Sequence, residues 1–100
     1  MKVYLSGKIT GDVNYKVKFA EKEKQLSELG YQVFNPALFP DMFTWDQFLD
    51  IDLKILSFCD AIYLMKGWES SKGANMEYRE ALRLGIKVIF DVGEENEKCA

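Results

Sequence analysis

The sequence predicts an α/β domain in which helices lie on both faces of a parallel sheet of about four strands. Short apolar runs alternate with longer segments of helical periodicity, and glycine and proline fall between them. Strands that alternate with helices in this way form parallel sheets with right-handed crossovers. One hundred residues suffice for one domain with a single core, so residues 1–100 are expected to form one domain.

The first part of the chain is expected to supply two strands and a helix. Residues 3–5 form a buried strand, and a glycine-bounded loop follows over 6–14. A helix over 15–29 stops at Gly30, a residue typical of the position just past a helix end, and residues 31–34 form the second strand. The residues expected on the buried side of this helix are Val17, Ala20, Leu26, Leu29 and the stem of Lys24.

A second helix is predicted by Thr44, which is followed three residues later by Gln47 in the pattern of a capping box. This helix is expected to run to about Cys59. Its apolar residues recur at spacings of three and four, as a core-facing surface requires. The expected buried stripe is Trp45, Phe48, Leu49, Leu53 and Leu56.

The last part of the chain is expected to add two strands and a third helix. The strands cover residues 61–65 and 88–90, and the helix between them covers 73–84, with Gly85 past its end. The acidic residues 91–100 are expected to form a frayed tail. The expected inward stripe of the third helix is Ala74, Tyr78, Ala81, Leu82 and Gly85.

Four strands connected in this way favour the three-layer, flavodoxin-like or Rossmann-like order 2-1-3-4. The switch point then lies between the first and third strands, where ligands bind outside the carboxyl ends. The loops that follow those two strands, 6–11 and 66–73, are rich in glycine, serine and lysine. Topology and composition therefore predict a ligand site at the same place.

Two carboxylates fall on the inward faces of the last two helices. Asp52 lies inside the apolar stripe, whereas Asp46 and Asp50 lie outside it, and Glu77 lies on the inward line of the third helix. A buried carboxylate is costly unless it is paired or hydrogen-bonded. Structural roles stay open: Asp52 can bond backbone amides or a lysine, and the helix dipole favours a glutamate near a helix start. Two converging carboxylates also suit retaining glycosyl transfer at an acetal-like carbon.

Composition narrows the functional classes further. The chain has no histidine, which excludes Ser-His-Asp and Cys-His nucleophiles and removes the commonest metal ligand, and we expect neither a metal site nor a cofactor. A net charge of −3 argues against a nucleic-acid polymer as partner. Six lysines against three acids in residues 1–25 still leave room for a small anionic ligand.

Neither the apolar runs nor the cysteines indicate a membrane protein or a secreted protein. No run approaches the roughly 20 apolar residues of a membrane span, and the N-terminal run is too short for a signal peptide. We therefore expect a cytoplasmic protein without membrane contact. Cys59 and Cys99 lack metal-like spacing and form no disulfide framework, and Cys59 is expected to act as a small buried hydrophobe.

Three segments in this order resemble the nucleoside 2-deoxyribosyltransferase-like superfamily, above all its small phage and bacterial branch of unknown function. They are Tyr4-Leu5-Ser6-Gly7-Lys8-Ile9-Thr10-Gly11, then Asp52 and Asp60, then Ser71-Lys72-Gly73-Ala74-Asn75-Met76-Glu77. The resemblance extends from Val3 to Phe90. It implies an N-glycosidase or deoxyribosyltransferase acting on a deoxyribonucleoside or its 5′-monophosphate. It also implies a homodimer or higher homo-oligomer.

The resemblance further implies catalytic roles. Glu77 matches the nucleophile that attacks the anomeric carbon and holds the sugar as a glycosyl ester. Tyr4 matches the tyrosine that positions this carboxylate, and Asp52 matches the aspartate at the sugar or leaving-base side. Ser71 occupies a position that is serine in the monophosphate hydrolases and aspartate in the transferases, which favours a phosphate-bearing substrate.

Substrate contacts are expected from the two loops at the switch point. Ser71, the Gly73 amide and the helix start form an anion site of a common kind. The loop after the first strand is expected to line the same site, with further phosphate contacts from some of its residues, which are Ser6, Gly7, Lys8, Ile9, Thr10 and Gly11. Trp68 is the residue we expect to stack on a base, although a place in the ordinary core stays open for it.

Two other functions stay open from the sequence. One is a non-catalytic module that binds a nucleoside or nucleotide in the same crevice. The other is metal-assisted phosphoryl transfer, which is disfavoured because the first loop lacks a Gly-Lys-Ser/Thr ending. The aromatic residues Phe39, Phe43, Trp45 and Trp68 are assigned either to the core or to a dimer interface.

Overall fold

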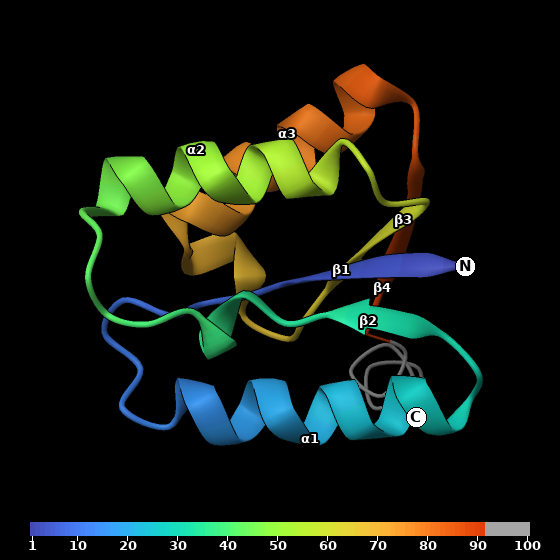
Figure 1. The fold of residues 1–100 in the computed structure, drawn as a ribbon, viewed down its shortest axis with the longest axis horizontal. Helices are drawn as coiled ribbons and strands as arrows, with labels where there is room; N and C mark the ends of the chain where they lie inside the picture. The colour runs from blue at the N-terminus through green and yellow to red at the C-terminus, as the bar shows by residue number, and fades with distance from the viewer. Residues whose placement is uncertain (92–100) are drawn as a thin grey trace.

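Four parallel strands form one sheet, in the order β2-β1-β3-β4 (Figure 1). In the computed structural model, which describes residues 1–91, the strands are β1 (Lys2–Ser6), β2 (Gln32–Phe34), β3 (Ala61–Leu64) and β4 (Lys87–Phe90). The predicted fold class, strand order and switch point between β1 and β3 are confirmed. The expected frayed tail lies outside the described residues, apart from Asp91.

The central strand β1 turns alternate side chains to opposite faces of the sheet. Val3 and Leu5 join a core cluster with residues of the first helix, whereas Tyr4 joins a separate cluster on the other face. Ser6 also faces the second side, where it contacts the third helix. All four side chains are buried, as expected for a strand with a neighbour on each edge and a layer on each face.

Helix α1 (Tyr15–Glu28) covers one face of the sheet through a different stripe from the one predicted. Phe19 and Leu26, which are two helical turns apart, are its buried residues, and Phe19 is only 1% exposed. Of the predicted stripe only Leu26 is buried: Val17 is 58% exposed, and Ala20, Lys24 and Leu29 are also exposed. Apolar residues occur around most of this helix, and burial of the large Phe19 ring removes the most apolar surface from water.

Helices α2 (Trp45–Leu56) and α3 (Lys72–Leu84) cover the opposite face (Figure 1). The capping box at Thr44 is present: its side chain accepts from the Gln47 amide, and the Gln47 side chain accepts from the Thr44 amide. The helix ends at Leu56, three residues before the predicted end. Three expected stripe positions are wrong, since Trp45 is 41% exposed, Leu82 is 55% exposed and Gly85 is also exposed.

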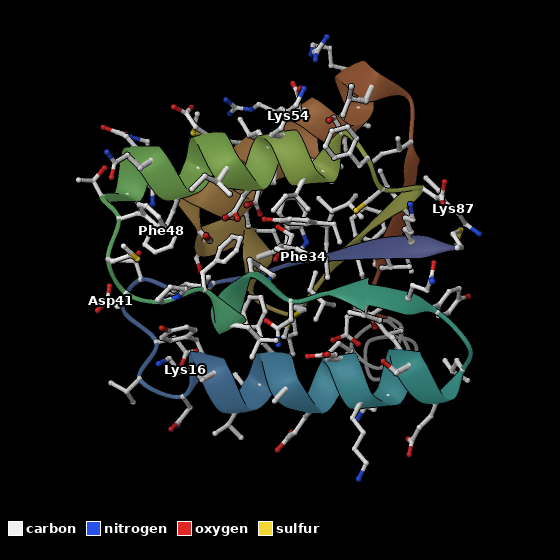
Figure 2. All side chains as sticks on the ribbon, in the orientation of Figure 1. Lys16, Phe34, Asp41, Phe48, Lys54 and Lys87 are labelled. Atoms are coloured by element: carbon white, nitrogen blue, oxygen red, sulfur yellow. The ribbon has the colours of Figure 1, made fainter. Side chains whose placement is uncertain are left out.

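Side chains between these helices and the sheet are largely apolar. In Figure 2, Phe34 and Phe48 lie between α2 and the sheet, whereas Lys54 points away from them. Cys59 is buried, and its thiol donates to the Ile55 carbonyl at 3.5 Å, which confirms its expected role as a small hydrophobe. Within residues 1–91 no helix has the length and apolarity needed to cross a membrane.

Two short 3-10 helices were not predicted, and both lie in loops at the carboxyl ends of strands. The first, η1 (Pro36–Leu38), is capped by the buried Asn35, whose side chain accepts from the Ala37 amide at 2.9 Å. The Asn35 amide also donates to Glu23 of α1 at 3.0 Å. The second, η2 (Trp68–Ser70), leads into the Ser71 cap of α3.

Candidate active site

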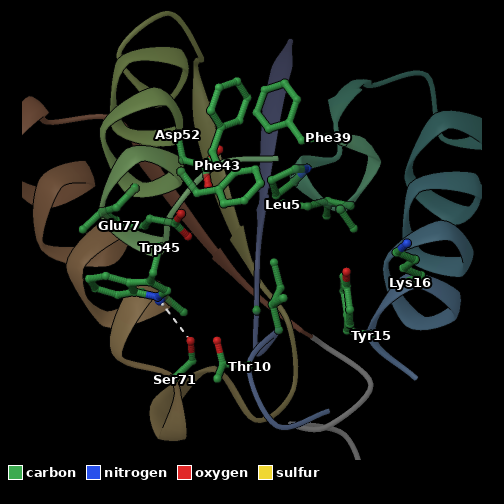
Figure 3. A pocket seen from close by; sticks show the side chains of 18 of the residues that line it. Leu5, Thr10, Tyr15, Lys16, Phe39, Phe43, Trp45, Asp52, Ser71 and Glu77 are labelled. Atoms are coloured by element: carbon green, nitrogen blue, oxygen red, sulfur yellow. Dashed lines mark hydrogen bonds between the residues drawn. The ribbon is translucent and has the colours of Figure 1, made fainter. Parts of the chain in front are cut away.

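A cavity of about 290 Å³ opens at the carboxyl end of β1 (Figure 3). Its walls come from the loop after β1, the start of α1, the segment from η1 to α2, and the first turns of α3. Residues of both loops named in the sequence analysis, 6–11 and 66–73, line the cavity. Its lining residues are Leu5, Gly7, Ile9, Thr10, Tyr15, Lys16, Pro36, Ala37, Phe39, Asp41, Phe43, Trp45, Phe48, Leu49, Asp52, Ser71, Gly73, Ala74 and Glu77.

Glu77 presents a buried carboxylate held by two hydroxyl groups of β1. The Tyr4 hydroxyl donates to Oε2 at 2.7 Å, and the Ser6 hydroxyl donates to Oε1 at 2.6 Å. The side chain is only 7% exposed, and burial raises its pKa to about 7. The bonds from Ser6 and Tyr4 act in the opposite direction by favouring the charged form. None of the ion pairs in the described part of the chain neutralises Glu77.

Asp52 is the second buried acid in the cavity wall. It is 8% exposed, and its Oδ1 is buried without a hydrogen-bond partner among the described residues. Burial raises its pKa to about 6, and the nearby Tyr4 hydroxyl partly offsets that rise. The pKa of Tyr4 lies well above its usual value because the ring is buried and faces the charges of Glu77 and Asp52. Tyr4 therefore stays a proton donor between two acids.

Small polar groups gather at the start of α3. The Ser71 side chain accepts from the Ala74 amide at 3.2 Å, which leaves its own hydroxyl proton available to another acceptor. The Asn75 amide donates to the carbonyls of Ser71 and Glu69, at 2.8 and 3.0 Å, and so fixes this turn. Figure 3 shows Ser71 and Thr10 at one end of the cavity. This end can accept an anion or a sugar hydroxyl.

Three phenylalanines form the opposite end of the cavity, and we call Phe39, Phe43 and Phe48 the aromatic wall. Phe48 packs against Phe39 with ring centroids 6.3 Å apart and against Phe43 at 5.5 Å. Phe43 directly precedes the Thr44 cap and Phe48 is the fourth helical residue, so their contact is a hydrophobic staple. Figure 3 shows Phe39 and Phe43 on the side where Asp52 lies.

The sequence of this chain matches one known protein family over nearly its whole length. The family described as "Domain of unknown function (DUF4406)" matches residues 1–90. The chain belongs to this family. No curated protein matches this DUF4406 member.

Two solved structures share the fold of this DUF4406 domain. A 2-deoxyribosyltransferase from Bacillus psychrosaccharolyticus is similar with a TM-score of 0.70 and 19% identity, over 90% of this chain and 71% of that chain. The CMP N-glycosidase of Clostridium botulinum has a TM-score of 0.65 and 24% identity, over 90% of this chain and 67% of that chain. The fold implied by the sequence resemblance is thus confirmed.

The DUF4406 structure brings together most of the residues singled out from the sequence. Tyr4 and Ser6 hold Glu77, and Asp52 lines the same cavity. The remaining predicted contacts that line it are Gly7, Ile9, Thr10, Ser71 and Gly73. Gly7 fits closely there, since a Cβ would lie 3.2 Å from Met65 Cβ and 3.3 Å from Phe19 Cζ, so that a side chain would require these neighbours to shift.

Three predicted contacts lie elsewhere. Lys8 and Gly11 are not among the residues that line the cavity. Trp68 is directed to the core, where its ring packs 5.0 Å from Tyr78 and 6.2 Å from Phe90. Its assignment as a base-stacking residue therefore has no support from its position.

The DUF4406 cavity also contains residues that sequence reasoning missed as ligand contacts. The principal ones are Tyr15 and Lys16 at the start of α1 and the aromatic wall. Aromatic residues in a segment between a strand and a helix cap were the available signal for the wall. The sequence alone left those rings equally compatible with an ordinary core.

Proposed function

We propose that this DUF4406 protein cleaves or transfers the N-glycosidic bond of a deoxyribonucleoside or its 5′-monophosphate, through a glycosyl ester on Glu77. One observation carries the proposal: a buried carboxylate in a cavity wall is held at both oxygens by hydroxyl donors, and no ion pair found within residues 1–91 neutralises it. Such a carboxylate is oriented and unneutralised, which are the properties a nucleophile needs. The two structural neighbours, by their names, act on deoxyribosyl groups and on CMP.

The first step forms the glycosyl ester and releases the base. A Glu77 oxygen attacks the anomeric carbon while the bond from this carbon to the base nitrogen breaks, and the bonding electrons leave with the base. Asp52 is the acid suited to protonate that base, because it is the second carboxyl group in the cavity wall and burial raises its pKa to about 6, above its ordinary value. Tyr4 and Ser6 position Glu77 and stabilise its charge before attack.

The second step regenerates the carboxylate. Water, or a second base, attacks the anomeric carbon, the bond to the Glu77 oxygen breaks, and Asp52 takes the proton of the attacking group. Retention of configuration follows from two successive displacements at the same carbon. Ser71, the Gly73 amide and Thr10 form the end of the cavity suited to a 5′-hydroxyl or 5′-phosphate. On this proposal the partners are small molecules of the cytoplasm, and the protein is a homo-oligomer.

Base release is the direct test. A panel of deoxynucleosides and their 5′-monophosphates is incubated with the protein, with and without an acceptor base, and products are separated chromatographically. We expect release by the wild type and a loss of at least about a thousandfold in Glu77→Ala, as is typical when a nucleophile is removed. Glu80→Gln is the matched control, because Glu80 is on the same helix but pairs with Arg83.

Trapping the ester tests the mechanism separately. A 2-fluoro-substituted deoxynucleoside slows both steps, and a good leaving base restores the first, so the ester accumulates. Mass spectrometry is expected to locate the added sugar on the peptide that contains Glu77. Release that survives Glu77→Ala would remove this residue from the mechanism. Ligand binding without any release would instead identify a binding module.

A further inference from the structure

Tyr4 lies between the two buried acids of the cavity and has one hydroxyl proton to donate. In the structure this proton goes to Glu77 Oε2, at 2.7 Å. The same hydroxyl is near enough to Asp52 to lower the pKa of that carboxyl group as a hydrogen-bond donor. Because a phenol has a single hydroxyl proton, Tyr4 serves one acid at the expense of the other.

The two acids are unequally supplied with donors. Glu77 also accepts a bond from Ser6 at 2.6 Å, whereas Asp52 Oδ1 is buried without a hydrogen-bond partner among the described residues. Both carboxyl groups lie on the same side of the cavity (Figure 3). A buried anion that lacks a donor is costly. An ionised Asp52 therefore needs a donor that the resting arrangement directs to Glu77.

The proposed reaction moves the negative charge between these acids. In the first step Glu77 changes from a carboxylate to a neutral ester, while Asp52 gives its proton to the departing base and becomes a carboxylate. In the second step Asp52 takes a proton from the attacking group, and Glu77 leaves the sugar as a carboxylate. One negative charge is present throughout, and it changes place twice. A charged acceptor binds a donor more strongly than a neutral one, so the Tyr4 bond is expected to follow the charge.

We propose that the Tyr4 hydroxyl turns from Glu77 to Asp52 when the glycosyl ester forms, and turns back when the ester is broken. The inference rests on the proposed function and gives Tyr4 a positioning role toward the second acid. Turned to Asp52, the hydroxyl stabilises the carboxylate that base departure leaves and keeps it ionised, as the base of the second step must be. Tyr4 keeps its proton throughout, because its pKa lies well above the usual value.

Other titratable groups of the cavity stand apart from this exchange. Among the described lining residues they are Tyr15 and Lys16 at the start of α1 and Asp41 in the segment before α2. The pKa values of the two buried acids are set by burial, by the hydroxyl groups of β1 and, for Glu77, by the charge of Asp52. The rings and aliphatic groups packed around Tyr4, such as Phe34, carry no charge.

A protein that cannot react tests the exchange. In Glu77→Gln the side chain at position 77 is neutral, like the ester, so Tyr4 is expected to donate to Asp52. Carbon-13 NMR of aspartate-labelled protein gives the pKa of Asp52, whose signal is assigned by its loss in Asp52→Asn. Adding Tyr4→Phe should raise this pKa by about 1 or more, because the ionised form loses its donor. Ser6→Ala is the matched control and should leave it within about 0.3, since Ser6 bonds the side chain at position 77.

A second NMR measurement leaves the tyrosine in place. In the Glu77→Gln protein, the ring carbon that bears the Tyr4 hydroxyl should change its chemical shift with the pKa of Asp52. This pH dependence should vanish when Asp52→Asn is added. Thermal unfolding shows whether each variant is folded. The exchange is refuted if Tyr4→Phe leaves the pKa of Asp52 in place, if Ser6→Ala moves it equally, or if the Tyr4 signal does not follow Asp52.

Kinetics of the trapped ester test the exchange during the reaction. Hydrolysis of the 2-fluoro sugar from Glu77 reports the second step alone, and its rate should rise with pH as Asp52 ionises. Tyr4→Phe is expected to move this rising limb to higher pH. A limb that stays in place while the rate falls at every pH would mean that Tyr4 serves Glu77 alone. An ester that never forms in the wild type refutes the proposed function, whereas the NMR titrations decide on the Tyr4 bond without any turnover.

Discussion

The two faces of the sheet bury very different groups. Under α1 the core consists of apolar and aromatic residues such as Val3, Leu5 and Phe19. Under α2 and α3 the same strand buries Tyr4 and Ser6 against Glu77 and Asp52. Because β1 alternates its side chains, one strand serves an apolar core on one side and an acid pair on the other.

The two faces therefore differ in what burial does to the stability of the fold. Burial of an apolar ring lowers the free energy of the folded state, whereas burial of a carboxylate raises it. Both faces bury apolar clusters that contribute stability, and on the α2–α3 face the buried carboxylates partly offset that contribution. Substitutions in the apolar core under α1 are expected to lower stability and to change activity little. Substitutions of the residues that hold Glu77 are expected mainly to lower activity.

The largest expected effect on stability is from Phe19→Ala. Removing a fully buried phenylalanine leaves a cavity and costs about 3–5 kcal/mol in the free energy of unfolding. Denaturant unfolding measures this loss, and base release below the unfolding transition is expected to change little. Val17→Ala on the same helix is the control, since Val17 is exposed. A loss below about 1 kcal/mol for Phe19→Ala would contradict the view that the α1 face stabilises the fold through burial of this ring.

A smaller effect is expected from the pH dependence of stability. The folded protein holds the Glu77 proton up to a pKa of about 7, against 4.5 for the ordinary group. Between these values the folded state binds more protons than the unfolded state, so stability falls as pH rises. The loss attributable to Glu77 approaches about 3 kcal/mol between pH 4 and 8. Glu77→Gln, which carries no charge, should remove this part of the decline and leave the part that comes from Asp52, whose pKa is also raised.

Thermal or denaturant unfolding across that pH range provides the measurement. Glu80→Gln is the control because Glu80 is on the surface, where its pairing with Arg83 lowers its pKa rather than raising it. We expect its curve to keep the wild-type decline toward high pH. Curves of the same slope for Glu77→Gln and the wild type would show that Glu77 has no raised pKa.

The smallest of the three effects is expected from Tyr4→Phe. The change removes one of the two bonds to the Glu77 carboxylate, and a bond to a charged group contributes about 1.5–3 kcal/mol. We expect kcat/KM for base release at pH 7 to fall about tenfold or more. The rising limb of the pH–rate profile should move to higher pH, because the Tyr4 bond lowers the pKa of Glu77.

A tyrosine on the other face gives the matched comparison. Tyr63 is buried under the α1 face, where its hydroxyl donates to Asp91. Tyr63→Phe is expected to leave the pH–rate profile in place. Equal shifts of the rising limb in both variants would point to a general change in the domain rather than to the bond on Glu77.

The order of the helices and strands could be predicted from the sequence, whereas the buried side of α1 could not. Glycine, proline and the Thr44 capping box are local signals, and they placed the helices and strands to within about three residues. The buried side of α1 depends on contacts with distant strands. Leu26 was predicted correctly, but hydrophobicity alone could not distinguish Val17 and Leu29 from Phe19, which is the residue that the sheet buries.

The same limit applies to the candidate site. Asp52 and Glu77 stood out because a carboxylate on an apolar face is a local anomaly. The aromatic wall could not stand out in this way, since a phenylalanine near a helix start looks the same in a core and in a cavity. Trp68 was assigned to the cavity from its loop, yet contacts with Tyr78 and Phe90 direct its ring inward.

The bonds that orient Glu77 also fix when the site can form during folding. Its two partners are 73 and 71 residues earlier in the chain. Strand β1 is made first, yet one of its neighbours, β3, and the helix α3, which carries Glu77, come from the last 40 residues of the described chain. Contacts between segments so distant in sequence form late, because closing long loops costs entropy. A nascent chain that lacks α3 therefore has no paired carboxylates, and the site arises only when the last layer docks.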